Sequence, residues 1–269
     1  MMKIGFIGLG NMGGSLARLV ARDERYRSEL LLANRSRDKA EKIAAEVGGQ
    51  PVSNAEVFAQ AEVIFLGIKP AQFADLLAEY QEILEKRESL LLVSMAAGLS
   101  LKILEKLTSS HHRWIRIMPN TPVAVGEGVI SYALSQQANQ ADEDLLRELL
   151  SSAGLLVKLE EKQLDAATAL AGCGPAFVYL FIEALADAGV RAGLSRDISL
   201  ELANQTLLGA TKLSQVSGRH PAQLKDQVCS PGGSTIAGVA SLEENAFRGT
   251  VMDAVQVAYK RTQELREKS

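Results

Sequence analysis

A glycine-rich segment near the start of the chain constrains the fold more than any other feature. The residues Gly8-Leu9-Gly10-Asn11-Met12-Gly13 follow a β-type run at 3–7 and precede a stretch of helical character at 15–21. In a G-x-G-x-x-G turn between strand and helix, the first glycine makes the tight turn, the second lets a pyrophosphate approach, and the third lets the helix pack on the strand. The pattern alone is weak, but this strand–turn–helix setting predicts a dinucleotide site. Its expected cofactor-binding residues are Gly8, Gly10, Asn11, Met12 and Gly13.

The residues after the second predicted strand indicate which dinucleotide is bound. The apolar run 30–33 ends at Asn34, Arg35 and Ser36, and Lys39 lies one turn into the following predicted helix. NAD-specific sites usually carry an acidic residue here for the ribose 2′-hydroxyl, whereas a neutral residue beside cations suits a 2′-phosphate. We therefore expect Asn34, Arg35 and Ser36 to bind NADPH, with the use of NADH left open. The alternative is that Arg35 is only a surface charge.

Three further apolar runs continue the alternation of strands and helices. They span residues 63–68, 90–94 and 114–118. Ligands of open α/β sheets bind beyond the carboxyl ends of the strands, so the loops after these runs should line one crevice. The small residues after the second run would leave room for a nicotinamide ring. The N-terminal half is thus expected to be an α/β Rossmann-type doubly wound sheet, and these loops add the cofactor-binding residues Ile68, Lys69, Pro70, Ala96, Ala97, Gly98 and Asn120.

The second half of the chain has helical patterning only. Strand signals stop after the run 155–159, and the rest is rich in Ala and Leu at helical spacing. We therefore divide the chain into an NADP(H)-binding domain of residues 1–159 and an all-α domain of residues 160–269. The Gly172-Cys173-Gly174-Pro175 segment is expected to interrupt a long apolar helix, which usually has a packing or ligand reason. Cys173 is expected to be a small packed residue and not a nucleophile, because no histidine base lies near it in the sequence. Helices are expected at 164–171, 176–192, 199–216 and 250–265.

The segment Ser230-Pro231-Gly232-Gly233-Ser234-Thr235 predicts a loop that ends at a helix N-terminus. The helix-like residues 236–240 follow it directly. Such a turn presents free backbone N–H groups and the positive end of a helix dipole, which together hold a small carboxylate or phosphate. Ser234 or Thr235 could cap the helix or bind the ligand. The expected substrate-binding residues are Ser230, Gly232, Gly233, Ser234 and Thr235, and the alternative is a capped turn without a ligand.

The composition excludes several classes of protein. A net charge of −3 over 269 residues, without a dense Lys/Arg tract, argues against a nucleic-acid partner. We find no apolar run of about 18 residues and no signal peptide, so we expect a cytoplasmic protein without a membrane segment. Two cysteines do not make a disulfide framework, and the three histidines include the pair His111-His112 in a polar run, 108–113, that is expected to be a solvated loop. Without ligands at metal-binding spacing, no metal site is expected.

With both halves in view, the chain closely resembles the pyrroline-5-carboxylate reductases, essentially from end to end. The resemblance rests on the glycine-rich turn, on Gly67-Ile68-Lys69-Pro70, on Met118-Pro119-Asn120-Thr121-Pro122, on Gly172-Cys173-Gly174-Pro175-Ala176-Phe177 and especially on the 230–235 segment. It implies reduction of 1-pyrroline-5-carboxylate to L-proline by hydride transfer from NAD(P)H, the last step of proline biosynthesis.

The resemblance also implies roles for subunits and residues. The helical domain would interlock with a second subunit in a homodimer, and such dimers often assemble into decamers. Thr235 and the amides of Gly232 and Gly233 would line the pyrroline pocket at the dimer interface, and Asn54 would lie near the adenosine ribose. Cys173 stands where serine is often found in the family, and Ser234 stands at a position that also takes alanine or threonine.

The chemistry of imine reduction agrees with a chain that is poor in histidine. Reduction of a ketone creates an alkoxide and needs a positioned acid, whereas hydride addition to a protonated imine gives a neutral amine directly. Thr235 could then serve as a catalytic residue by hydrogen bonding the ring nitrogen. A β-hydroxyacid dehydrogenase is the enzyme alternative, but the predicted helix 175–192 contains no lysine to act as its acid and base. A non-catalytic NADP(H) sensor is the alternative from another class, and it would not need the 230–235 anion pocket.

Overall fold

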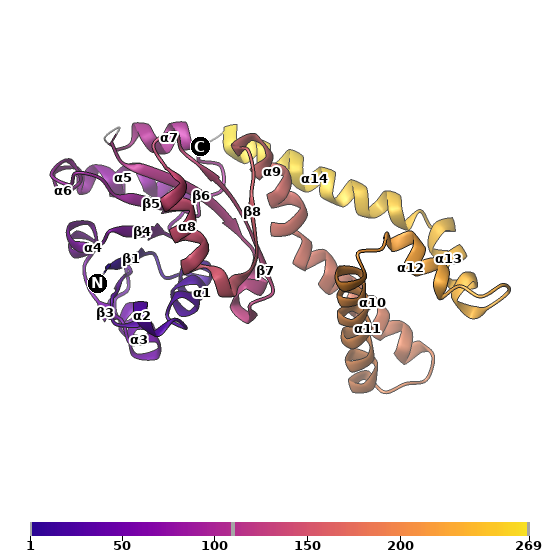
Figure 1. Ribbon diagram of the computed structural model, residues 1–269. Helices are drawn as coiled ribbons and strands as arrows, with labels where there is room; N and C mark the ends of the chain where they lie inside the picture. The colour runs from indigo at the N-terminus through magenta and orange to yellow at the C-terminus, as the bar shows by residue number, and fades with distance from the viewer. Residues whose placement is uncertain (1, 109–110, 268–269) are drawn as a thin grey trace. The chain divides into compact units, whose positions relative to one another are not determined.

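The computed structural model describes residues 2–108 and 111–267, and they form two compact units (Figure 1). Unit 1 contains the described residues up to Cys173 together with those from Ala258 onward, and unit 2 is Gly174–Val257. These units divide the chain at a different place from the expected domains 1–159 and 160–269. That expected division, which follows sequence character and not compactness, stays a prediction.

Unit 1 is built on one eight-stranded sheet with the order β3-β2-β1-β4-β5-β6-β7-β8. All neighbouring strands are parallel except β6 and β7, which pair antiparallel. The order of the first six strands is that of the classic dinucleotide-binding sheet. The strands are β1 (Ile4–Ile7), β2 (Leu30–Ala33), β3 (Gln50–Pro51), β4 (Val63–Leu66), β5 (Leu91–Ser94), β6 (Arg113–Pro119), β7 (Gly128–Leu134) and β8 (Gly154–Lys158).

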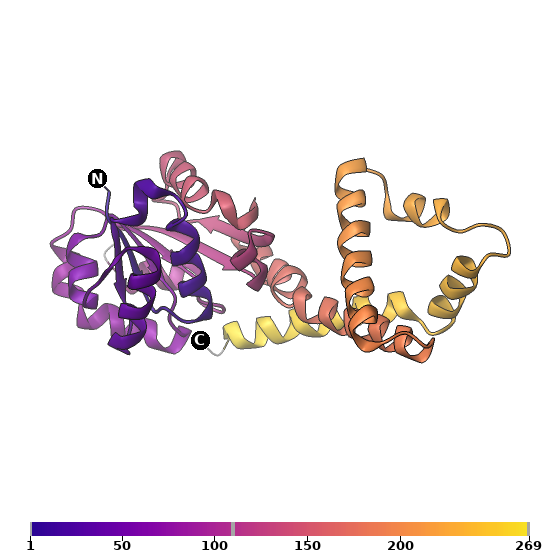
Figure 2. The same cartoon turned by 90° about the horizontal axis from the view of Figure 1, so that it is seen from below.

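Helices cover both faces of this sheet (Figures 1 and 2). They are α1 (Asn11–Val20), α2 (Glu24–Arg27), α3 (Arg37–Val47), α4 (Asn54–Gln60), η1 (Pro70–Gln72), α5 (Phe73–Glu79), α6 (Gln81–Glu85), α7 (Leu101–Lys106), η2 (Thr121–Val125), α8 (Gln140–Leu149), η3 (Ser151–Ala153), η4 (Glu161–Gln163), α9 (Leu164–Ala167) and the π-helical η5 (Thr168–Gly172). Local sequence starts several of them, since Ser53 and Glu56 form a capping box at α4 and Asn139 caps α8.

The core consists of two apolar clusters, one on each face of the sheet. Phe6 and Phe65 stack at 4.7 Å on the face that packs against α1, α3 and α8. Ile64, Leu92 and Trp114 belong to the other cluster, which packs against α4 to α7. Because both faces are covered, β1, β2, β4 and β5 are buried along their whole length and read as continuous apolar runs in the sequence. The prediction of an α/β doubly wound sheet is confirmed.

The expectation of a solvated loop at 108–113 is wrong for His112. Residues 109–110 lie outside the described residues, but the His112 side chain is only 1% exposed and its Nδ1 accepts a hydrogen bond from the Leu90 N–H. His111 is exposed, and its Nε2 lies 2.9 Å from the Arg87 carbonyl oxygen. Burial lowers the pKa of His112 to about 4, with a further contribution from the neighbouring His111.

Unit 2 is entirely helical, and α10 and α11 pack against each other within it. Its helices are α10 (Gly174–Arg191), α11 (Arg196–Ser217), α12 (Pro221–Gln227), α13 (Ser234–Glu244) and the first part of α14 (Phe247–Glu267). Large apolar side chains stay exposed along these helices, including Tyr179, Leu180, Leu202, Leu208, Leu213, Val216, Met252 and Val257. A chain of this composition normally buries such faces against a partner.

Regular α-helix is interrupted at the expected segment 172–175 and in the turn before it, but helical turns continue on both sides of the interruption. A π-helical turn occupies Thr168–Gly172, Cys173 forms a bend, and α10 begins directly at Gly174. As a result, residues 161–191 form one helical segment that is long and apolar enough by length and composition to cross a membrane, the only one among the described residues. The sequence analysis missed it because it treated the Gly-Pro pair as a break. Length and composition do not distinguish a membrane span from an apolar helix that another subunit covers.

Candidate active site

The glycine-rich turn has the geometry that a pyrophosphate needs. Gly8 has φ 89°, and a Cβ there would lie 2.7 Å from the Gly67 carbonyl oxygen. A Cβ on Gly13 would lie 2.1 Å from the Gly8 carbonyl oxygen, so this glycine permits the close packing of α1 on β1. A Cβ on Gly10 would meet no atom within 4 Å. Gly10 is also the N-cap of α1 and has no side-chain cap, which leaves the first amides of α1 available to an anion.

A cavity of about 750 Å³ lies at the carboxyl ends of β1, β2 and β4. Gly10 lines this cavity, so a side chain at position 10 would occupy space that is open to a ligand. Of the expected cofactor-binding residues, the cavity is lined by Gly8, Gly10, Asn34, Arg35, Ser36, Asn54, Ile68 and Lys69. The sequence analysis missed the contribution of η1 and α5, which add Gln72, Asp75, Leu76 and Glu79. The position of that helical segment directly after the Lys69-Pro70 loop is the signal that could have indicated it.

At the end of β2, the side chain of Asn34 connects two loops. Its Oδ1 accepts the Leu9 N–H at 3.0 Å, and its Nδ2 donates to the Ser36 carbonyl oxygen at 3.1 Å. Asn34 therefore holds the glycine-rich turn against the segment that carries Arg35. Within the described part of the chain, neither the Arg35 nor the Lys39 side chain makes a hydrogen bond or ion pair, whereas nearby Arg37 pairs with Glu41 at 2.9 Å.

Asn54 also lines the cavity, as the first residue of α4. Its side chain contacts the Tyr80 hydroxyl, and the pKa of Tyr80 is raised by burial and by the neighbouring Glu79 carboxylate. The capping box between Ser53 and Glu56 fixes the start of this helix, with the Ser53 N–H donating to the Glu56 carboxylate at 2.8 Å. The capped start of α4 therefore holds the Asn54 side-chain amide at the cavity.

The other expected residues lie outside this cavity lining. Asn11, Met12 and Gly13 form the first turn of α1, Pro70 begins η1, and Ala96, Ala97 and Gly98 follow β5. Ala97 is exposed, Ala96 is buried, and Gly98 has φ 87°. The Asn120 side chain donates to the Ala171 carbonyl oxygen and accepts the Val129 N–H, so its amide already joins β6 and β7 to η5. Cofactor contacts of these residues stay predictions.

Within unit 2, the 230–235 segment forms a tight turn followed by α13. The Gly233 N–H donates to the Ser230 carbonyl oxygen at 3.0 Å, and Gly232 at the turn has φ 68°. The N-cap of α13 is Gly233, and no side chain caps the helix. The expectation that Ser234 or Thr235 caps the helix is therefore wrong, because these are its first two residues. Their hydroxyl groups and the first amides of α13 remain available for a ligand.

The thiols and candidate metal ligands add no second centre. Cys173 and Cys229 are free and half-buried. Across residues 2–108 and 111–267, no three His, Cys, Asp or Glu residues gather where they could hold a metal ion. Among the described residues, the dinucleotide cavity and the α13 turn are the two features that correspond to the sites expected from the sequence.

The doubly wound sheet, its glycine-rich turn and the helical second unit define a two-domain NADP(H)-dependent oxidoreductase. Two family models match the chain: NADP oxidoreductase coenzyme F420-dependent at residues 3–98, and pyrroline-5-carboxylate reductase dimerisation at residues 161–265. A pyrroline-5-carboxylate reductase of Pisum sativum is 45% identical over 264 residues, which cover 97% of this chain and 95% of that protein. Pyrroline-5-carboxylate reductase 2 of Homo sapiens is 37% identical, with 98% and 84% covered. The chain belongs to the pyrroline-5-carboxylate reductase family.

Solved structures agree with this assignment. The crystal structure of Plasmodium falciparum pyrroline carboxylate reductase with NADP bound has a TM-score of 0.87 and 36% identity, and the match covers 98% of both chains. The structure of a pyrroline-5-carboxylate reductase from Coxiella burnetii has a TM-score of 0.90 and 29% identity, again with 98% of both chains covered. The fold of each unit therefore corresponds to this family.

Proposed function

We propose that this protein reduces 1-pyrroline-5-carboxylate to L-proline with NADPH, the last step of proline biosynthesis. The observation that carries the proposal is the pair of features in one chain of this family: a glycine-lined dinucleotide cavity and an uncapped helix N-terminus at the 230–235 turn. The first suits a pyrophosphate and the second suits the carboxylate of a small substrate.

The residues of the cavity fit NADPH. The open side of Gly10 leaves space that a Cβ would fill, and the first amides of α1 bind the pyrophosphate there. Arg35, Ser36 and Lys39 bind the 2′-phosphate, because the two cations have no ion-pair partner among the described residues and lie beside a neutral Asn34. NADH, which lacks that phosphate, is then a weaker donor. Asn54 contacts the adenosine ribose, and the loop of Ala96 to Gly98 gives the nicotinamide room.

The bound dinucleotide supplies a hydride to the carbon of the substrate C=N bond. The substrate binds with its nitrogen protonated, so the electron pair of that bond moves to nitrogen and leaves a neutral amine without a strong acid in the protein. The amides of Gly233, Ser234 and Thr235 hold the carboxylate, and the Thr235 hydroxyl bonds the ring nitrogen. Ser230 and Gly232 shape this turn. The chain's contribution is therefore binding and orientation.

The family model for dimerisation supports an oligomer, and we propose that a second copy covers the exposed apolar faces of unit 2. A homodimer buries the apolar helical segment 161–191 in protein, and dimers assemble further, into decamers. This accounts for the apolar helix without a membrane. The protein is then a cytoplasmic enzyme with a small-molecule substrate and no nucleic-acid partner.

The reaction is tested by following the absorbance of NADPH in the presence of 1-pyrroline-5-carboxylate or of one of a series of keto acids. Oxidation of NADPH with the cyclic imine alone is the expected result. Turnover with keto acids alone would refute the imine mechanism. NADPH binding without turnover on any of these compounds would favour a sensor protein.

A further inference from the structure

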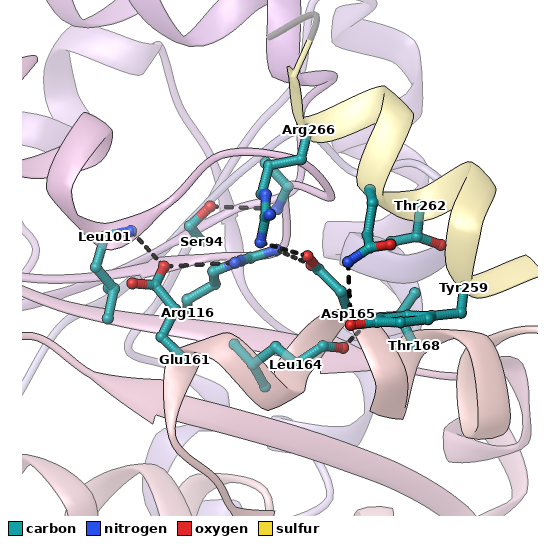
Figure 3. A network of polar contacts seen from close by, with 12 residues as sticks. Ser94, Leu101, Arg116, Glu161, Leu164, Asp165, Thr168, Tyr259, Thr262 and Arg266 are labelled. Carbon is teal, nitrogen blue, oxygen red and sulfur yellow. Dashed lines mark hydrogen bonds and ion pairs between the residues drawn. The ribbon is translucent and has the colours of Figure 1, made fainter.

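Arg116, on β6, carries a buried guanidinium group outside the dinucleotide cavity (Figure 3). The residue is only 2% exposed, and it lies on the same face of the sheet as Trp114 and Ser94. A buried guanidinium must be neutralised by carboxylates. Two of them approach it, Glu161 at 3.4 Å and Asp165 at 3.5 Å, while the Arg116 Nε has no hydrogen-bond partner within residues 2–108 and 111–267.

Both carboxylates also bind a second, closer partner. The Glu161 Oε1 accepts the Leu101 N–H at 2.6 Å, and the Asp165 Oδ2 binds the Arg266 guanidinium at 2.7 Å. Arg266 lies near the end of α14, in the part of that helix that belongs to unit 1. The side chains therefore form a continuous series from the C-terminal helix through Arg116 to the start of α7 (Figure 3).

The series ends with Glu161, which lies at the loop 95–100 between β5 and α7. Leu101 is the first residue of α7, so the Glu161 carboxylate anchors the point at which the loop ends. At the other end, the Ala96 N–H donates to the Ser94 Oγ at 3.2 Å, and Ser94 pairs in register with Arg116. The start of the loop is thus held by a local bond on the strand that pairs with β6, and its end is held by a carboxylate that also contacts Arg116.

We propose that Glu161 and Arg116 are positioning residues for the loop 95–100, and that Arg266 keeps them aligned through Asp165. The inference rests on the proposed function, because it takes Ala96 to Gly98 to lie beside the nicotinamide. Removal of the Glu161 carboxylate leaves the Leu101 N–H without its acceptor and frees one end of the loop. A displacement of about 1 Å at a reacting centre costs up to about 100-fold in rate. The adenosine half of the dinucleotide binds elsewhere in the cavity, so affinity is retained.

The test compares Glu161→Ala and Glu161→Gln with the matched control Glu160→Ala. Glu160 is exposed, and its carboxylate forms an ion pair with Lys162. Its backbone N–H, which donates to the Gln163 Oε1, is kept in the alanine variant. Gln at position 161 keeps an oxygen that can accept the Leu101 N–H. For Glu161→Ala we expect kcat to fall at least about tenfold, the NADPH dissociation constant to stay within about twofold, and hydrogen exchange of the 95–104 backbone to accelerate. Glu161→Gln should recover kcat to within about threefold, and Glu160→Ala should match the wild type.

Several results would overturn the proposal. These are an unchanged kcat in Glu161→Ala, a parallel loss of kcat and NADPH affinity, no rescue by Glu161→Gln, or unchanged hydrogen exchange. If Glu161→Ala does not fold, Arg266→Ala is tested instead, because the Arg266 side chain is 39% exposed and its loss should be tolerated by the fold. A normal kcat and unaltered hydrogen exchange in Arg266→Ala would refute the proposed role of Arg266 and Asp165. A wild type that binds NADPH but does not reduce the imine refutes the proposed function instead, and the exchange measurement on the protein without cofactor still decides whether Glu161 holds the loop.

Discussion

Gly10 and Gly13 lie in the same turn, yet a methyl group should lower a different property at each position: dinucleotide affinity at position 10 and stability at position 13. A Cβ at position 13 would lie 2.1 Å from the Gly8 carbonyl oxygen, and a Cβ at position 10 would meet nothing within 4 Å. Gly13→Ala should therefore damage the fold, whereas Gly10→Ala should damage only dinucleotide binding. The pair separates a structural glycine from one that is needed for the ligand.

The magnitudes follow from these contacts. The Gly8 oxygen belongs to the backbone and cannot swing away, so Gly13→Ala should cost about 3 kcal/mol, at the upper end for overpacking. For a chain of this size that lowers Tm by roughly 6–12 °C. Gly10 has φ −62° and ψ −167°, which alanine also adopts, so its stability should change by less than about 1 kcal/mol. A methyl group pressed against the pyrophosphate should cost about 1–3 kcal/mol of binding, or roughly 5- to 150-fold in affinity.

Thermal unfolding without cofactor and calorimetric titration with NADPH measure the two effects separately. Gly10→Ala should unfold like the wild type and bind NADPH much more weakly. Normal NADPH affinity in a folded Gly10→Ala protein would refute the placement of the pyrophosphate. Wild-type stability of Gly13→Ala would refute the packing argument.

Three further predictions concern the cofactor, the substrate and pH. Arg35→Ala should raise KM for NADPH by roughly 10- to 150-fold and leave KM for NADH unchanged, because a charge-assisted contact is worth about 1.5–3 kcal/mol. Steady-state kinetics with both cofactors measure this, and equal losses with NADPH and NADH would exclude a phosphate contact. Thr235→Ala should lower kcat with the imine while calorimetry finds NADPH affinity unchanged, and a matching loss of cofactor affinity would contradict its role. Because burial lowers the pKa of His112 from 6.5 to about 4, the folded state favours the neutral imidazole. The contribution of neutral His112 to the free energy of unfolding is therefore complete above pH 6.5 and falls toward pH 4, with about 2 kcal/mol lost by pH 5. Urea unfolding of the wild type at pH 7 and pH 5 should show this loss. An equal loss in His112→Gln would show that the pH dependence does not come from His112.

The parts of the fold that could be predicted are those that the sequence determines locally. The glycine-rich turn, the strand before it and the helix after it follow from residues within one short segment. The buried strands β2, β4 and β5 read as apolar runs because both faces of a parallel sheet are covered. β7, at Gly128–Leu134, was not singled out, although its apolar run is visible, because its antiparallel pairing with β6 depends on distant residues.

The candidate site shows the same division. Gly8, Gly10 and Arg35 were found from a motif with a stated mechanism, and the cavity includes them. The hydrogen bond of Asn120 to Ala171 joins residues 51 positions apart, so no local pattern could predict that its amide is already engaged. The burial of His112 likewise follows from packing and not from its polar neighbours in the sequence.

The protein transfers hydride from NADPH to the C=N bond of 1-pyrroline-5-carboxylate. The most direct measurement uses NADPH with deuterium at both hydrogen positions of the nicotinamide C4, and it analyses the product by mass spectrometry and NMR. We expect L-proline with a single deuterium at C5 and an equal amount of NADP⁺. Proline without deuterium, or oxidation of NADPH without formation of proline, would contradict it.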